Sequence, residues 1–297
     1  MRKLLLLCGV LALAACAPTS IAFASVGHLR GHHDGGGYNG GSQGGGPGDD
    51  RGDGHDYPGG GFQGGGFQGP GDRDGRGYRH VFVCNGTYTG VWVRDLVVPP
   101  SGVCLLTNSI IDGGVAVRSN GDFEAGTTSI RGDVQADGAQ TVYVYAGSTV
   151  NGDINTDATS QTQIFDSSVT GEVRVQQGTG QVYLCNDTVG WGIAVRGSGP
   201  NILVGDHLDP NCPGNVVNQG NIVVSDNATY VELSVGDNSV PHGSIFVTNN
   251  QGTPVGTSGE NVQGNQGGYA LVCEGNASPF LGSPNPGWAQ YVGQCSA

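Results

Sequence analysis

Carboxylate side chains recur at a regular spacing through the middle of this 297-residue chain. Asp133, Asp153 and Glu172 follow one another at nearly equal intervals, and Asp137 and Asp157 lie four positions after the first two. These acids are expected to form a solvated face that keeps the protein soluble, without a cofactor. The alternative is a cation site on the same five residues, with calcium as the ion, because calcium is held by several carboxylate and carbonyl oxygens.

Glycan chemistry is a second possibility. Inverting glycoside hydrolysis uses a carboxylic acid and a carboxylate base about 6.5–9.5 Å apart. The tripeptide Asn155-Thr156-Asp157 resembles the N-T-D motif of polygalacturonases, although the Asp-Asp, Gly-His-Gly and Arg-x-Lys motifs that accompany it in that family are missing from the repeat region. Tyr143, Tyr145 and Tyr183 are candidates for stacking against sugars, or for covering the wall of the fold.

The elements that position these residues follow from a repeat. The apolar residues that lead each copy stand at positions 111, 130, 150, 169 and 189, and a nearly constant period of this size indicates a solenoid. In each copy apolar and polar residues alternate, as in Ile130 to Asp137, which is typical of half-buried strands. A second apolar column is expected at positions 144, 164, 184, 204 and 224.

These patterns predict an all-β, single-stranded parallel β-helix with about 19–20 residues per coil, a length typical of solenoid repeats. A right-handed helix is expected because the hexapeptide spacing of left-handed ones is absent. The recurring glycines, such as Gly132 and Gly152, are expected to leave room for bulky residues from the opposite wall.

Six cysteines stand in the repeat region, at 84, 104, 185, 212, 273 and 295. An even number in an exported chain indicates disulfides, and six cysteines allow 15 arrangements. Proximity in sequence favours the pairs Cys84–Cys104, Cys185–Cys212 and Cys273–Cys295, and the first of these would pin the N-terminal cap of the solenoid. Zinc is the rival interpretation, but no Cys-x-x-Cys spacing is present and histidines are few.

The segment before position 81 predicts export and a tether. Residues 1–24 have a basic start, an apolar run and a small-residue end, as a secretory signal does. Leu13-Ala14-Ala15-Cys16 also resembles a bacterial lipobox, so lipidation of Cys16 at the cell surface is the alternative to free secretion. Residues 25–80 are Gly-rich with few apolar side chains, which predicts a disordered linker before the domain at 81–297. No transmembrane segment is expected once the signal is removed.

The charge balance excludes some partners. The chain has a net charge of -13 and 12 Lys plus Arg, and its single lysine is Lys3 in the leader. Nucleic acid is not an expected partner because phosphate backbones are bound by Lys and Arg. A lysine base or Schiff-base chemistry is excluded from the mature chain.

Two family resemblances follow from the repeats. Ile130-Arg-Gly-Asp-Val134, Val150-Asn-Gly-Asp-Ile154 and Val169-Thr-Gly-Glu-Val173 resemble the V-x-G-D-I coils of bactofilins, which are polymer-forming β-helix proteins that lack an export signal and disulfides. From Cys84 to Cys295 the chain is similar to exported, uncharacterised bacterial β-helix proteins of pectate-lyase-like type, a resemblance that implies a fold and no activity.

Two function classes remain open. The first is a non-catalytic exported β-helix that acts as a structural, surface or matrix-associated binding module, with polysaccharide or cell-envelope components as partners. The alternative is a polysaccharide lyase or glycoside hydrolase of the pectate-lyase-like fold. A groove in which at least two acids and one base converge would favour the enzyme.

Overall fold

The computed structural model describes residues 81–229, 231–252, 260–277, 280–281 and 284–296. The predicted signal sequence (1–24), Cys16 and the Gly-rich segment (25–80) lie outside the described residues. The described chain is a parallel β-solenoid of about ten turns, as the repeat predicts. No helix among the described residues has the length and hydropathy to cross a membrane.

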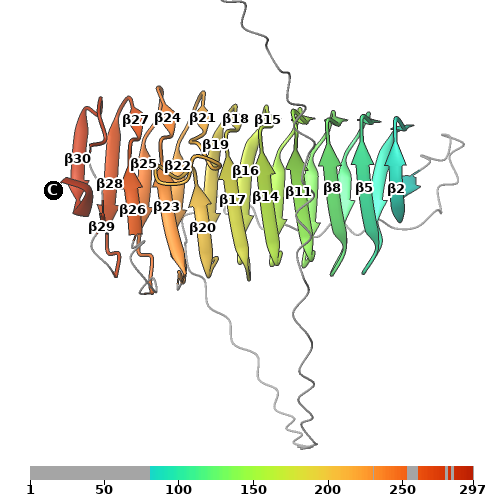
Figure 1. Ribbon diagram of the computed structural model, residues 1–297, viewed down its shortest axis with the longest axis horizontal. Coiled ribbons are helices and arrows are strands. Elements are labelled where there is room, and N and C mark those ends of the chain that lie inside the picture. Colours follow the sequence, from blue (N-terminus) through green and yellow to red (C-terminus); the bar gives the residue numbers. More distant parts are fainter. Residues whose placement is uncertain (1–80, 230, 253–259, 278–279, 282–283, 297) are drawn as a thin grey trace, which may run out of the picture. The chain divides into compact units, whose positions relative to one another are not determined.

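Each full coil contributes one strand to each of three parallel sheets (Figure 1). Sheet A consists of β1 (Val81–Val83), β4 (Asp95–Val98), β7 (Val115–Val117), β10 (Val134–Asp137), β13 (Ile154–Asp157), β16 (Glu172–Gln176), β19 (Gly192–Arg196), β22 (Ile222–Ser225), β25 (Ile245–Thr248), β28 (Ala270–Glu274) and β30 (Gln290–Gly293). Sheet B consists of β2 (Gly86–Thr89), β5 (Val103–Thr107), β8 (Asp122–Gly126), β11 (Thr141–Tyr145), β14 (Gln161–Phe165), β17 (Gln181–Cys185), β20 (Asn201–Val204), β23 (Glu232–Gly236), β26 (Glu260–Gln263) and β29 (Phe280–Leu281). Sheet C consists of β3 (Trp92–Val93), β6 (Ile110–Ile111), β9 (Ser129–Ile130), β12 (Thr149–Val150), β15 (Ser168–Val169), β18 (Thr188–Val189), β21 (Val216–Val217), β24 (Ser239–Val240) and β27 (Gln266–Gly267). A short 3₁₀ helix, η1 (Gln294–Ser296), follows β30.

The core is built from columns of equivalent inward positions. Successive strands pair in parallel, so residues at the same place in each coil stack about 4.8 Å apart. The five lead apolar positions form one such column along sheet C, from Ile111 to Val189, and each is at most 1% exposed. Val134, Ile154 and later apolar residues form the matching column of sheet A. The alternation in the sequence therefore predicts correctly which of these side chains are inside.

The coil length is nearly constant only in the first half of the solenoid. Val134 pairs with Ile154, one regular period later, whereas Ile193 pairs with Ile222, in a clearly longer coil. The expected placement of Val224 in a column with Val204 is wrong: Val224 belongs to β22 of sheet A, and Val204 pairs with Val235 in sheet B. The cause is extra chain after β20, at positions 205–215, which delays the return to the sheets.

The recurring glycines have a different role from the expected one. A Cβ on Gly152 would overlap Asp133 Oδ1 and lie 2.8 Å from the carbonyl carbon of Gly132, and Gly171 stands in the same way against Asp153. These glycines therefore admit the backbone and the aspartate of the preceding coil, not a bulky residue from the opposite wall. These turns can stack closely only because glycine has no side chain.

Buried polar residues form a ladder along the turn between sheets B and C. The equivalent positions are Ser109, Thr128, Ser148, Ser167, Asp187, Asn215, Asn238, Asn265 and Asn285, all at most 8% exposed. From Asn215 onward the ladder consists of asparagines, and their side chains hydrogen-bond through both the amide oxygen and the amide nitrogen. Asn238 Oδ1 accepts the N–H of Asn215, and Asn238 Nδ2 donates to the carbonyl of Val204. These bonds satisfy backbone groups that the turn leaves unpaired, as buried polar groups require.

Asp187 interrupts that pattern. Its Oδ1 accepts the N–H of Ser167 at 2.9 Å, as an asparagine oxygen would, but its Oδ2 is buried without a hydrogen-bond partner. In the next coil Asn215 Nδ2 donates to the carbonyl of Leu184, and Leu184 pairs with Ile164 in the sheet. By this register, Asp187 Oδ2 occupies the position from which the Nδ2 of an asparagine would donate to the carbonyl of Ile164.

The environment of Asp187 opposes its charge. Burial raises the pKa of this carboxyl well above the usual aspartate range, and repulsion from Asp166 raises it further, whereas hydrogen bonding from the backbone of Ser167 and of Cys185 acts to lower it. The neutral form is therefore favoured inside the turn.

A second ladder follows the turn between sheets A and B in the C-terminal half. It runs through Ser198, Asn227, Asn250, Asn276 and Gln294, and from Asn227 onward each side-chain oxygen accepts the N–H of the residue one coil earlier. Both ladders extend the hydrogen bonding of the sheets through the turns.

The three disulfides are those favoured by proximity in sequence. Cys84–Cys104 lies in the first coils and Cys273–Cys295 in the last, with Cα atoms 5.4 and 5.3 Å apart. Cys185–Cys212 has Cα atoms 4.8 Å apart and joins β17 to the extra chain after β20. The three pairs fit an oxidising environment.

Candidate functional site

Four aromatic side chains form a strip across three strands of the outer face of sheet B. The strip consists of Tyr143 and Tyr145 on β11, Phe165 on β14 and Tyr183 on β17, whose strand neighbours point into the core. The rings of Tyr143 and Tyr145 are stacked 4.4 Å apart, and Phe165 meets Tyr143 and Tyr183 edge to face at 5.9 and 6.5 Å. Gly126 of β8 makes room for the ring of Tyr145, because a Cβ there would lie 2.8 Å from it. The three predicted tyrosines thus lie together, and Phe165 connects them.

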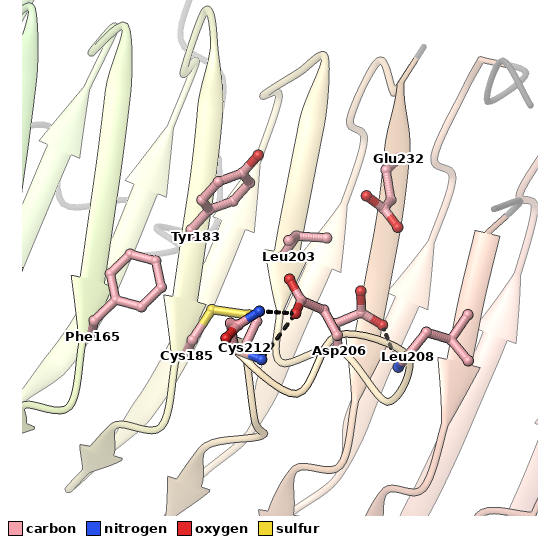
Figure 2. Close-up of a pocket in the computed structure, with 10 residues that line it drawn as sticks. Phe165, Tyr183, Cys185, Leu203, Asp206, Leu208, Cys212 and Glu232 are labelled. Carbon is pink, nitrogen blue, oxygen red and sulfur yellow. Dashed lines mark hydrogen bonds between the residues drawn. A yellow bond between two sulfur atoms is a disulfide. The ribbon is translucent and has the colours of Figure 1, made fainter. Parts of the chain in front are cut away.

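A cavity of about 460 Å³ opens at the β17 end of this aromatic strip. Its apolar lining comes from Phe165, Tyr183, Leu203, Leu208 and the Cys185–Cys212 disulfide, and its polar lining from Asp206, Asp209, Asn211 and Glu232. Figure 2 shows Phe165 and Tyr183 on one side of the disulfide and Glu232 on the other, with Asp206 between them. The cavity combines aromatic surface with carboxylates, so it offers both apolar and polar contacts to a ligand.

The segment after β20, residues 206–214, supplies half of the residues that line the cavity and is fixed at several points. Asp206 donates its N–H to the carbonyl of Cys212 at 2.7 Å, and its carboxylate accepts the N–H of Leu208 at 2.9 Å. The carboxylate of Asp209 accepts the N–H and the amide of Asn211. Because Cys185 stands next to Phe165 in the sheet, its disulfide holds this segment, called here the pocket loop, on the outer face of sheet B.

The surroundings of the aromatic strip raise the pKa of two carboxyl groups, those of Glu232 and Glu124. Burial raises the pKa of Glu232, and the neighbouring Asp206 and Asp209 raise it further. Burial and the nearby Asp122 raise the pKa of Glu124, which pairs with Tyr143 in the sheet. Both ends of the aromatic strip therefore carry acids whose charge lacks compensation.

An amide also lies beside the cavity. Asn201 Nδ2 donates to the hydroxyl of Tyr183 at 2.7 Å, which orients that ring. Asn201 is 8% exposed, its Oδ1 has no hydrogen-bond partner, and its backbone stands opposite Glu232 in the sheet. A buried acceptor without a partner is costly, so it favours a donor at this place.

The five acids of the predicted calcium face lie elsewhere, at the start and on the outside of sheet A. Asp133 Oδ1 accepts the N–H of Asp153 at 2.9 Å, and Asp153 Oδ1 accepts the N–H of Glu172 at 2.8 Å, while Glu172 pairs with Arg174. Asp137 and Asp157 are direct neighbours on β10 and β13.

Within the described part of the chain no three His, Cys, Asp or Glu side chains form a group that could hold a metal ion. Calcium binding stays a prediction, which calorimetric titration of wild type and Asp157→Asn with calcium tests.

The N-T-D tripeptide is also remote in the fold from the cavity. Asn155 and Asp157 face outward on sheet A, whereas Thr156 points inward and its hydroxyl lies 3.1 Å from that of Thr162. The cavity belongs to sheet B, so this motif contributes nothing to it.

Sequence reasoning missed the pocket loop and Glu232. One signal could have revealed them: the period breaks after Val204, in a segment that also holds Cys212. Insertions in a solenoid form loops on one face, which is often the binding face.

No protein family, no curated protein and no solved structure matches this chain in the comparisons with known proteins. The class of the protein is therefore given by its architecture alone, a disulfide-bonded parallel β-solenoid with an aromatic and acidic cavity on one sheet.

Proposed function

We propose that this protein is a non-catalytic, exported binding module that attaches to polysaccharide in the cell envelope or an extracellular matrix through the outer face of sheet B. The observation that carries the proposal is the aromatic strip leading into the cavity. Ring faces bind the apolar side of a sugar, and carboxylates and amides bind its hydroxyl groups. The three disulfides support a location outside the reducing cytoplasm.

The rigidity of the support favours binding. The rings stand on strands of a continuous parallel sheet, and the pocket loop is held by a disulfide and by hydrogen bonds. A site that is ordered before the ligand arrives loses little conformational entropy on binding.

A pooled polysaccharide array tests the proposal. The full chain is applied with and without calcium, and both retention and release of shortened fragments are measured. Retention without cleavage, lost in Tyr183→Ala, is the expected result. Retention that is unchanged in both Tyr183→Ala and Phe165→Ala refutes a site on sheet B.

One observation favours a second candidate, a glycoside hydrolase. Burial raises the pKa of Glu232, which lies with Asp206 and Asp209 around one cavity, and such enzymes use a pair of carboxyl groups of which the general acid has a raised pKa. In this alternative Glu232 protonates the glycosidic oxygen and an aspartate activates water. No Lys, Arg or His lines the cavity among the described residues, which favours hydrolysis over a lyase reaction. Cleavage in the array that is abolished by Glu232→Gln would establish this function.

A further inference from the structure

Sheet B carries acidic but no basic side chains on the described strands that flank the aromatic strip. From β2 to β23 the described strands of sheet B contain no Lys, Arg or His. They contain Asp122 and Glu124 at one end of the strip and Glu232 at the other, where the pocket loop adds Asp206 and Asp209. A ligand that runs along the strip meets carboxylates at both ends.

The basic side chain of the pocket loop is already paired. His207 Nδ1 lies 2.7 Å from Asp237 Oδ1, and His207 does not line the cavity. Among the described residues, nothing in the lining therefore offsets the negative charge of the cavity. The carboxylates Glu232 and Asp209 also raise the pKa of Tyr183, after the larger effect of burial.

On the basis of the proposed function, we propose that the polysaccharide is an amine-bearing one, a polymer of amino sugars with free, protonated amino groups. Ammonium groups are attracted to aromatic faces and form charge-assisted hydrogen bonds with carboxylates, and this surface offers both.

The spacing of the rings favours a regular polymer, and the acids at both ends favour one with positive charges. Tyr143 and Tyr183 occupy one column of sheet B, two strands apart. The distance between them is therefore about 10 Å at ~4.8 Å per strand, and a chain of stiff, repeating units can contact both rings at once. A polyuronate places carboxylates against Glu124 and Glu232 and is repelled.

Calorimetry with three oligosaccharides of equal length tests the proposal. The full chain is titrated with oligomers of glucosamine, N-acetylglucosamine and galacturonate, at low and at high salt, below neutral pH so that the amines are charged. We expect the glucosamine oligomer to bind about tenfold or more tightly than its acetylated form, and to lose most of that preference at high salt.

Matched variants locate the charge effect. Glu232→Gln is expected to weaken glucosamine binding about tenfold, the order of one charge-assisted hydrogen bond, and to leave acetylated binding within about twofold. Glu274→Gln, an exposed acid on β28 of sheet A, is the control and should change neither.

The outcomes separate the two proposals. Equal binding of the acetylated and free amines, unaffected by Glu232→Gln, overturns the amine preference while the glycan module stands. Binding of galacturonate, with or without calcium, overturns the amine preference too. Absence of binding to every polysaccharide, in the titrations and on the array, overturns the module itself.

Discussion

Asp187→Asn is expected to stabilise the solenoid at neutral pH. The wild-type side chain has one buried oxygen without a partner, in a column where asparagines donate from that position. The folded protein avoids a buried negative charge only if it keeps the Asp187 carboxyl group protonated. At pH 7 this costs about 1.4 kcal/mol for each pH unit above the unfolded pKa of about 3.9, so the ceiling is about 4 kcal/mol. An amide donates to the carbonyl of Ile164 without that cost.

The direction of the pKa shift determines how the stability difference between the two proteins changes with pH. The folded pKa of Asp187 is raised, so its contribution to stability is fully present below the unfolded pKa and is lost as the pH rises towards the folded pKa. The wild type therefore gains stability relative to Asp187→Asn as the pH falls from 7 to 4, and the stabilities of the two proteins converge there.

Thermal melts between pH 4 and pH 8 measure this effect. A gain of about 2 kcal/mol at pH 7, half of the ceiling, raises Tm by about 4–8 °C in a domain of this size. Asp157→Asn, an exposed acid on β13, is the control and should shift Tm by far less. The reasoning fails if Asp187→Asn lowers Tm at pH 7, or if its effect is the same at pH 4 and pH 8.

Three further predictions concern the pocket loop and the stacking of the coils. The double variant Cys185→Ser/Cys212→Ser should keep the circular dichroism of the β-solenoid but lose most of its affinity for the glycan, because the pocket loop is no longer fixed; unchanged affinity contradicts this role of the disulfide. Gly152→Ala should destabilise by about 1–3 kcal/mol in urea unfolding, since its Cβ would overlap Asp133 and the preceding backbone. Its control is the exposed neighbour Asn151→Ala, and equal midpoints for the two variants would remove the packing argument. Asn238→Ala should cost about 1–3 kcal/mol, because the N–H of Asn215 and the carbonyl of Val204 lose partners inside the fold, and hydrogen exchange at Asn215 should accelerate.

The fold was predictable where one coil copies the previous one. Strict alternation and a nearly constant period identify the inward column from Ile111 to Val189, and cysteines close in sequence identify the disulfides. The prediction failed at Ile222–Val224, because an insertion after Val204 shifts the register while the same apolar pattern continues. Equal spacing in the sequence does not imply equal coils.

The site was predictable only in part. The outward tyrosines follow from alternation, but their contacts with Phe165 depend on the stagger of neighbouring strands. Glu232 approaches Asp206 only because the pocket loop folds back over sheet B, a tertiary event that leaves no local pattern. The Asn ladders were hidden for the same reason, since their spacing follows the varying coil length.

The measurement that tests the central claim most directly is calorimetric titration of an amino-sugar oligosaccharide into wild type, Tyr183→Ala and Trp191→Ala. Trp191 is an aromatic residue, 64% exposed, that follows β18 outside sheet B, and so serves as the matched control. We predict that Tyr183→Ala weakens binding about tenfold or more while Trp191→Ala leaves it unchanged, with both variants keeping the circular dichroism of the β-solenoid. Equal binding by Tyr183→Ala, or loss of binding in Trp191→Ala alone, would contradict a glycan site on sheet B.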